Sequence, residues 1–412
     1  RLPPGSTLFP YTTLFRSVSL SLPGNLEVEG GSFQLPFAVA PAGCPSDWRL
    51  LATPEPGRLA VTSVAAGARQ VTDLQADVAW LPNAHLQLRG SAGVPLLGTR
   101  IGLSGTCAPW PAPAAEVTAN LPETVVGDGR LWARLAPVPA GLQLTGTVSG
   151  WTRLGYANGR LDGAAALDLS RGELRLSEPE ISMSGVRLQA RFPSLTPLRT
   201  APHQRLSFDS AVIGGMPLVG GNVVWQLEEG GLLFLEQAAV GWCGGTLRAF
   251  SVPLSLDRPE VDMVVYAEDV ELVRVFSLLQ GFKGSGQGRL YGRLPLSYRN
   301  GVFAYERGFL YSVPTEVGRL QVADASFLTR GVPPSDPSYG RLKLAEEALS
   351  DFSYSTVALE FAGRGGGDTR LRLRIVGEGG SRRRQPLDLT VNINGELEQY
   401  LNMGLRMLGT LP

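Results

Sequence analysis

Histidine and lysine are scarce in this chain. Its 412 residues include two His and two Lys, and arginine supplies almost all of the 37 basic side chains. So little histidine argues against His-based metal sites and against Ser–His or Cys–His catalysis. Asp and Glu also number 37, so the formal net charge is zero and no strongly basic surface is expected. We therefore expect no metal, no cofactor and no nucleic-acid partner.

Cysteine is scarce as well. The three cysteines, Cys44, Cys107 and Cys243, lie far apart, and none falls in a CxxC or metal-binding spacing. A Cys44–Cys107 disulfide would suit an oxidising compartment, but the odd count and the lack of a pattern leave the pairing open.

Long hydrophobic runs are missing too. The nearest is Ser210–Leu227, SAVIGGMPLVGGNVVWQL, which has no charge but is broken by Pro217 and several glycines. Such breaks predict two strands and a turn in place of a membrane-spanning helix.

No catalytic motif stands out. There is no GxSxG elbow, no HExxH and no EF-hand loop. The glycine-rich run GFKGSGQGRLYG at 281–292 precedes a predicted strand, whereas a phosphate-binding loop needs a helix N-terminus behind it. The pair Gly244-Gly245 predicts a turn or a bulge before the strand TLRAF. We therefore expect that the chain is not an enzyme.

Alternation of apolar and polar residues is the dominant pattern. In TRLRLRIV, the apolar residues Leu371, Leu373 and Ile375 alternate with three arginines. The runs TVALEF and LDLTVNIN alternate in the same way, and glycine-rich loops join the three. With 51 Gly and 31 Pro, turns are frequent throughout. The pattern predicts short antiparallel strands with one apolar and one polar face.

Predicted helices are few. They cover VELVRVFSLLQ after an Asp269 cap and before Gly281, KLAEEALSDF at 343–352, and ELEQYLNMGLRM at 396–407. Three short helices cannot cover a long apolar sheet face. That face must meet another sheet, close into a barrel, or contact something that is not protein, such as acyl chains. From the pattern alone, a closed sandwich core is favoured.

Several segments of the second half occur in a recognisable order. They are VGWCGGTLRAFSVPLSL, VELVRVFSLLQGFKGSGQGRLYGRLPLSYRNGVFAYERGFLYS, AEEALSDFSYSTVALEF, and RLRLRIVGEGG followed by QPLDLTVNINGELEQYLNMGLRM. From about residue 206 onward this order resembles the C-terminal region of the YdbH family, whose domain has the legacy name "dicarboxylate transport". The family belongs to the AsmA-like bridge-type lipid transporters.

The resemblance implies a fold and a function. The fold is mainly β, a long curved antiparallel sheet that forms an apolar groove, with a few short helices. The function is non-enzymatic transport of glycerophospholipids through the periplasm, between an inner-membrane anchor and the outer membrane. A small outer-membrane lipoprotein that adds a strand to an exposed edge is the partner implied. The alternative is a structural or adhesive all-β protein with a closed core.

The alternating strands predict where such a groove would lie. We expect its floor on apolar residues of three strands: Val357, Leu359, Phe361, Leu371, Leu373, Ile375, Leu387, Leu389, Val391 and Ile393. Arg382, Arg383 and Arg384 lie in the loop between two of these strands and are weaker candidates for contact with lipid headgroups.

The first residues differ from the rest. TLFPYTTLFRS, at 7–17, lacks capping signals and a clean period, and it can be encoded by the end of a common sequencing-library adapter. We expect residues 1–17 to be an assembly artefact and the chain to be the C-terminal fragment of a longer protein. The predicted organisation is then a β-rich groove segment at 18–205 and a YdbH-type C-terminal domain at 206–412.

Overall fold

The structure is a computed structural model of the 412-residue chain. It describes residues 13–22, 26–34, 37–41, 48–52, 56–66, 69–81, 85–108, 113–129, 131–132, 141–177, 180–213, 216–255, 260–277, 283–299, 302–314, 316–323, 329, 332–364, 369–380 and 384–395.

The chain divides into two compact units. Unit 1 comprises Arg1–Leu174 and Val186–Gln204, and unit 2 comprises Arg175–Gly185 and Arg205–Pro412.

Most of the elements between residues 13 and 213 are strands, and most of them lie in unit 1. They are β1 (Thr13–Leu22), β2 (Leu26–Gln34), β3 (Phe37–Pro41), β4 (Trp48–Ala52), β5 (Gly57–Ala66), β6 (Arg69–Trp80), β7 (Leu86–Val94), the 3-10 turn η1 (Pro95–Leu97), β8 (Thr99–Ala108), β9 (Ala114–Val126), β10 (Gln143–Ala157), β11 (Arg160–Leu176), β12 (Ile181–Phe192), β13 (Ser194–Leu195), β14 (Leu198–Arg199) and β15 (Gln204–Ile213).

The remaining elements belong to unit 2. They are β16 (Met216–Glu228), β17 (Leu232–Trp242), β18 (Gly245–Ser255), β19 (Val261–Glu271), α2 (Leu272–Ser277), β20 (Gly284–Gln287), β21 (Arg289–Arg299), β22 (Val302–Ser312), β23 (Gly318–Val322), α3 (Tyr339–Leu349), β24 (Phe352–Arg364), β25 (Thr369–Gly379) and β26 (Gln385–Gly395).

In both units, strands close in sequence pair antiparallel. In unit 1 the order β1–β2–β5–β6–β7–β8–β9–β10 is hydrogen-bonded throughout. In unit 2 the order is β16–β17–β18–β19–β21–β22–β24–β25–β26, and β20 joins β24 through β23. No described pairing links β26 back to β16, so this sheet is not closed. The predicted mainly β, antiparallel fold is confirmed.

Short turns fix the register of these hairpins. Cys243 and Gly244 connect β17 to β18, and both have a positive φ, 47° and 76°. A two-residue turn of this kind matches the twist of the strands that it joins. A turn is confirmed here, but it lies one residue earlier than predicted, because Gly245 is already the first residue of β18 and pairs with Trp242. The described residues of the uncharged run Ser210–Leu227 fall in two strands, β15 and β16, as predicted, and the predicted turn between them lies outside the described residues.

The helices differ from the prediction. Asp269 does not cap a helix: it lies inside β19 with φ 59°, next to a register shift, and α2 begins only at Leu272. The second predicted helix, at 343–352, is observed at Tyr339–Leu349, because Phe352 enters the core as the first residue of β24. The predicted helix at 396–407 lies outside the described residues.

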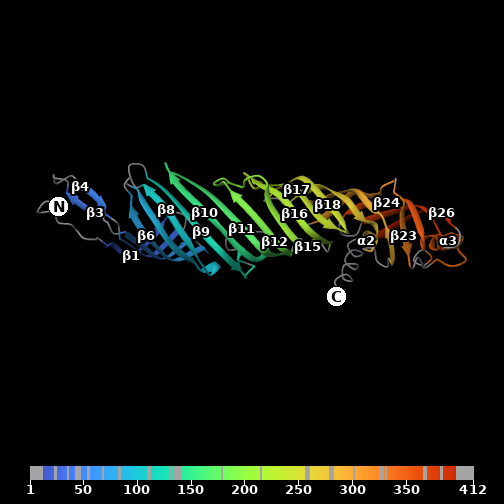
Figure 1. Ribbon diagram of the computed structural model, residues 1–412, viewed down its shortest axis with the longest axis horizontal. Helices are drawn as coiled ribbons and strands as arrows, with labels where there is room; N and C mark the ends of the chain where they lie inside the picture. The colour runs from blue at the N-terminus through green and yellow to red at the C-terminus, as the bar shows by residue number, and fades with distance from the viewer. Residues whose placement is uncertain are drawn as a thin grey trace. The chain divides into compact units, whose positions relative to one another are not determined.

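The two helices cover only small parts of the sheet. In Figure 1, α3 lies beside β23 and β26, and the structure places it in contact with β23, β25 and β26. The shorter α2 contacts β19 and β20. Among the described residues, neither helix has the length and the apolar composition that crossing a bilayer requires.

Candidate functional site

The predicted floor residues come together in rows across three strands. Val357, Ile375 and Leu389 lie opposite one another on β24, β25 and β26, and so do Leu359, Leu373 and Val391. The backbone positions of Phe361, Leu371 and Ile393 form a third row, although the side chains of Phe361 and Ile393 lie outside the described part. In an antiparallel sheet, directly opposed residues share a face. The three strands therefore present one apolar surface.

This surface continues through the rest of the sheet in unit 2. The Leu359 row extends without interruption to β16, and each position holds an apolar residue or glycine. We call it the central row: Gly221, Val240, Leu247, Ala267, Gly292, Leu310, Leu359, Leu373 and Val391. Sequence reasoning missed its first six members. Glycine and alanine carry little hydrophobic signal. In GRLPLSY, however, two leucines and a tyrosine alternate with other residues, and this pattern could have pointed to β21.

Exposure varies along the central row. Leu310 and Leu359 are 0% and 1% exposed, and Leu373 is 9% exposed. On β26, Leu387, Leu389 and Val391 are all half-buried. The apolar face is thus tightly packed at β22–β25 and more accessible at β26.

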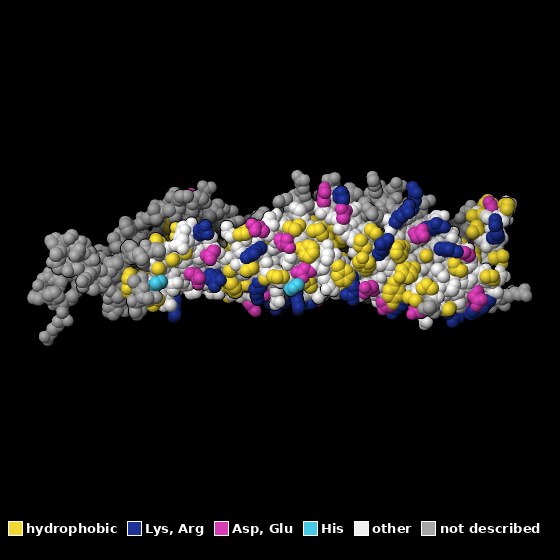
Figure 2. Space-filling view, turned by 90° about the horizontal axis from the view of Figure 1, so that it is seen from above, with side chains coloured by type: hydrophobic (Ala, Val, Ile, Leu, Met, Phe, Trp, Pro, Cys, Tyr) yellow, Lys and Arg dark blue, Asp and Glu magenta, His cyan; other side chains and the backbone are white. Residues whose placement is uncertain are grey.

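The opposite face of the same strands is polar. Arg370, Arg372 and Arg374 are exposed, and a row on this face runs through Arg248, Tyr266, Arg293, Phe309, Glu360, Arg372 and Asn392. The Arg293 guanidinium lies 5.4 Å from the centre of the Phe309 ring. Figure 2 shows hydrophobic side chains interspersed with charged ones. The predicted separation of an arginine face from a leucine face in β25 is confirmed.

Unit 1 repeats this arrangement. One apolar row crosses β5 to β9 through Leu59, Ala76, Gly90, Leu103 and Ala119. A second row passes from Val78 through Leu88 and Gly105 to Val117 and Leu154, which are 36% and 45% exposed. Apolar side chains that stay this exposed in an ordered sheet mark a surface that can accept apolar groups.

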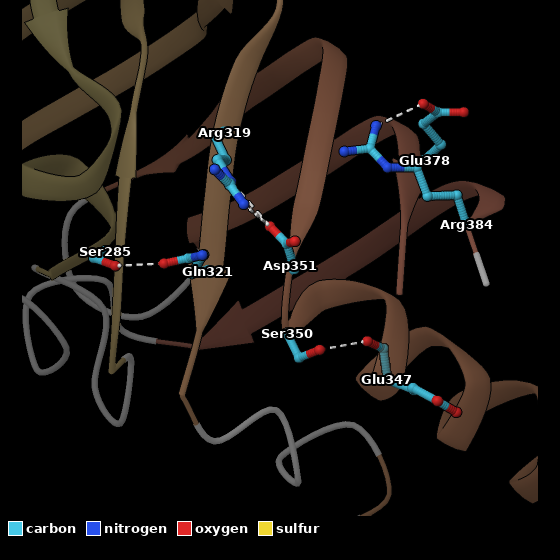
Figure 3. Close-up of polar contacts among 8 residues, drawn as sticks. All are labelled: Ser285, Arg319, Gln321, Glu347, Ser350, Asp351, Glu378 and Arg384. Atoms are coloured by element: carbon cyan, nitrogen blue, oxygen red, sulfur yellow. Dashed lines mark hydrogen bonds and ion pairs between the residues drawn. The ribbon is translucent and has the colours of Figure 1, made fainter. Parts of the chain in front are cut away.

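The three loop arginines are not seen together. Arg382 and Arg383 lie outside the described residues. Arg384 forms an ion pair of 2.9 Å with Glu378 across the β25–β26 hairpin (Figure 3). Its charge is therefore already engaged by a carboxylate.

Figure 3 also shows how the chain after α3 is fixed. Arg319 on β23 donates a hydrogen bond of 2.9 Å to Asp351, just before β24, and this bond holds the pKa of the Asp351 carboxyl below its ordinary value. Ser350 donates to the main-chain oxygen of Glu347 at the end of α3. These contacts position Phe352 and Tyr354 at the start of β24.

A cavity of about 240 Å³ lies beside Tyr354 in unit 2. Its lining comes from three places in the sheet: Gln287, Gly288 and Arg289; Ser312, Val313, Glu316, Val317 and Gly318; and Tyr354. Tyr354 is 1% exposed and its hydroxyl donates to the Gln287 carbonyl at 3.0 Å. Burial, and to a smaller extent the Glu316 carboxylate, raise the pKa of Tyr354 to about 12. The hydroxyl is therefore a stable donor at neutral pH.

No metal centre is found in the part of the chain that the structure describes, where no group of three or more His, Cys, Asp or Glu side chains converges. Cys107 and Cys243 are free thiols, and Cys44 lies outside the described residues.

Cys243 should be chemically inert in the folded chain. Burial raises the pKa of its thiol to about 12, and the nearby Arg274 opposes this only in part. Since the thiolate is the reactive species, only about one thiol in 10⁴ is reactive at pH 8. We expect iodoacetamide at pH 8 to modify the Cys243 peptide at least ~100-fold more slowly in the native protein than in urea, as measured by peptide mass spectrometry. Equal labelling in both states would contradict this environment.

Comparison with known proteins identifies a family. A family model described as "YdbH-like: Intermembrane phospholipid transport protein YdbH" matches residues 45–403. The match therefore extends into unit 1, beyond the segments after residue 206 that carried the resemblance in the sequence. No match was found among curated proteins or among solved structures. The open antiparallel sheets with one apolar face and the match over most of the chain agree: this chain belongs to the YdbH-like family of intermembrane phospholipid transport proteins.

Proposed function

We propose that the chain carries glycerophospholipids between the inner and outer membranes, with acyl chains along the apolar faces and headgroups in water. The observation that carries this proposal is the central row, an unbroken line of apolar residues and glycines from β16 to β26. A lipid lying along it would never have to cross a polar side chain of that row.

Transport of this kind needs no catalytic residue. Each methylene moved from water to an apolar surface contributes about 0.8 kcal/mol. Burying an unpaired charged headgroup would cost far more than that. A lipid therefore moves with its chains on the floor formed by the predicted residues of β24–β26, and its headgroup stays hydrated. The chain acts as a conduit, not as an enzyme.

The ends of the conduit would meet the two membranes. We propose that the protein works in the periplasm and is anchored in the inner membrane. Among the described strands β26 pairs with β25 alone, so it forms one edge of the described sheet. Such an edge can accept a further strand, and a small outer-membrane lipoprotein is the partner that we propose for it.

Lipid retention tests the proposal. The 412-residue chain would be purified from cells in mild detergent, extracted, and analysed by mass spectrometry against a protein of similar size treated identically. We expect phospholipid in a stoichiometric amount, well above the control. A folded protein with no more lipid than the control would refute transport through this face.

One observation favours a second candidate, a structural β-protein with a dry core. Val357, Leu359 and Leu371 are only 0–2% exposed, as they would be in a closed core. The same extraction decides between the two, because a dry core retains no lipid.

A further inference from the structure

Three neighbouring strands are interrupted at the same level of unit 2. β20 ends at Gln287 and β21 begins at Arg289, with Gly288 between them at φ 149°. β22 ends at Ser312 and β23 begins at Gly318. The register of β24 shifts between Tyr354 and Thr356. The cavity of about 240 Å³ is lined by residues of these three interruptions.

The cavity adjoins the apolar face. Ser312, one of its lining residues, lies opposite Leu290 and two positions beyond Leu310 of the central row. The Ser312 side chain is 3% exposed, and its hydroxyl oxygen accepts a hydrogen bond of 2.9 Å from the Val357 main-chain N–H. An acyl chain on the central row can therefore place the polar end of the same molecule in the cavity.

The cavity has one positively and one negatively charged side chain in its lining, Arg289 and Glu316. Arg289 donates from Nη1 to the Asp269 carbonyl at 3.0 Å, and lies 3.6 Å from the carboxylates of both Asp269 and Glu271. Glu271 also pairs with Arg274, at 2.6 Å. Two guanidinium groups, those of Arg289 and Arg274, thus lie near three carboxylates. The net negative charge favours a ligand that carries a positive charge of its own.

Glu316 is exposed, and it lines the cavity from the loop between β22 and β23. Its main-chain N–H is bonded to the Val313 carbonyl at 3.0 Å, which fixes the loop that carries it. Next to it, Val317 is 77% exposed, so this loop is the side on which the cavity meets solvent. A headgroup could enter here while remaining hydrated.

We propose that this cavity binds the phosphoethanolamine headgroup of a phospholipid, with the primary ammonium at Glu316. The proposal rests on the proposed function, and adds a headgroup preference to it. The volume fits, because about 240 Å³ corresponds to roughly eight water-sized groups and phosphoethanolamine has about eight non-hydrogen atoms. An ammonium group supplies three hydrogen-bond donors for the carboxylate and for main-chain carbonyls.

Other headgroups fit this chemistry less well. A phosphoglycerol headgroup brings a negative phosphate among three carboxylates with no cation of its own. A choline headgroup keeps the positive charge but has no N–H to donate, and its methyl groups need more space. The order expected is phosphoethanolamine above phosphocholine above phosphoglycerol.

Lipid competition tests this. The full chain would be incubated with vesicles of equimolar dioleoyl phosphatidylethanolamine, phosphatidylcholine and phosphatidylglycerol, re-isolated, and its bound lipids quantified by mass spectrometry. We expect phosphatidylethanolamine over phosphatidylglycerol by about tenfold in the wild type, which corresponds to ~1.4 kcal/mol. Glu316→Gln should reduce this ratio to about one.

Glu347→Gln is the matched control, since Glu347 is an exposed glutamate on α3 in the same unit and does not line the cavity. It should keep the wild-type ratio. A wild type without headgroup preference, or a Glu316→Gln variant that keeps it, overturns the inference while leaving transport intact. A wild type that binds no lipid at all overturns both the inference and the proposed function.

Discussion

Leu373→Glu should abolish lipid retention by the purified chain. Leu373 lies in the central row between Leu359 and Val391, and is 9% exposed. A glutamate there would interrupt the apolar floor. Each acyl chain that crossed it would have to lie against a polar side chain, either the charged carboxylate or the protonated carboxylic acid. We expect bound phospholipid, quantified by mass spectrometry of the extract, to fall at least ~10-fold.

Arg372→Glu is the matched control for this change. Arg372 is the neighbouring residue on β25, points to the opposite face and is exposed. It should leave bound lipid within twofold of the wild type. A folded Leu373→Glu variant with wild-type lipid content would contradict the placement of the floor.

Because Leu373 is largely buried, its glutamate variant can also fail to fold. Val391→Glu avoids this difficulty, since Val391 occupies the same row on β26 but is half-buried. Circular dichroism would establish that the variant keeps its strands. A folded Val391→Glu chain should lose lipid as Leu373→Glu does, and its control is Asn392→Glu on the exposed face.

Gly288→Ala should be among the most destabilising single substitutions in unit 2. Gly288 has φ 149°, a conformation that residues with a Cβ rarely adopt, and an added Cβ would lie 1.5 Å from the Tyr354 hydroxyl oxygen. The buried tyrosine ring would have to move and would lose its hydrogen bond to the Gln287 carbonyl. Backbone strain and the lost bond together predict a fall of about 3 kcal/mol in the free energy of unfolding, measured by urea titration.

Gly102→Ala provides the comparison. Gly102 is an exposed residue of β8, its φ is not positive, and an added Cβ there meets nothing within 4 Å. This alanine should change the free energy of unfolding by no more than about 1 kcal/mol, in the stabilising direction. If both alanine variants unfolded at the same urea midpoint as the wild type, the result would contradict the close packing of Tyr354 against Gly288.

For the regular strands, the sequence predicts which residues lie on the apolar face and which lie on the polar face. In TRLRLRIV, strict alternation gives the apolar side unambiguously, and Leu371, Leu373 and Ile375 are indeed 2%, 9% and 3% exposed. The glycine pair Gly244-Gly245 predicted a turn within one residue of the observed one, Cys243-Gly244, where both residues have a positive φ. In such segments, local pattern and tertiary structure agree because neither is interrupted by an irregularity.

Irregularities mark where sequence reasoning failed. Asp269 has the chemistry of a helix cap, yet it lies in β19 with a positive φ, and accepts a hydrogen bond from the Tyr291 hydroxyl. Ser251 also has a positive φ, 54°, and the buried positions of β18 pass from Ala249 to Val252 around it. The alternation of buried positions therefore shifts by one residue at Ser251 although the β17–β18 register does not change, so a period-2 reading places the next side chains on the wrong face.

The sequence alone determined the fold class, the two-faced strands and the scarcity of groups for catalysis, because each follows from composition or from residues adjacent in the chain. The tertiary structure decided the central row and the cavity. Ala267 and Gly292 become part of an apolar floor only through the cross-strand register that sets them beside Leu247 and Leu310. Arg289, Glu316 and Tyr354 meet only because three strands are interrupted at one level. Register and interruption depend on hydrogen bonds between distant residues, which local pattern cannot specify.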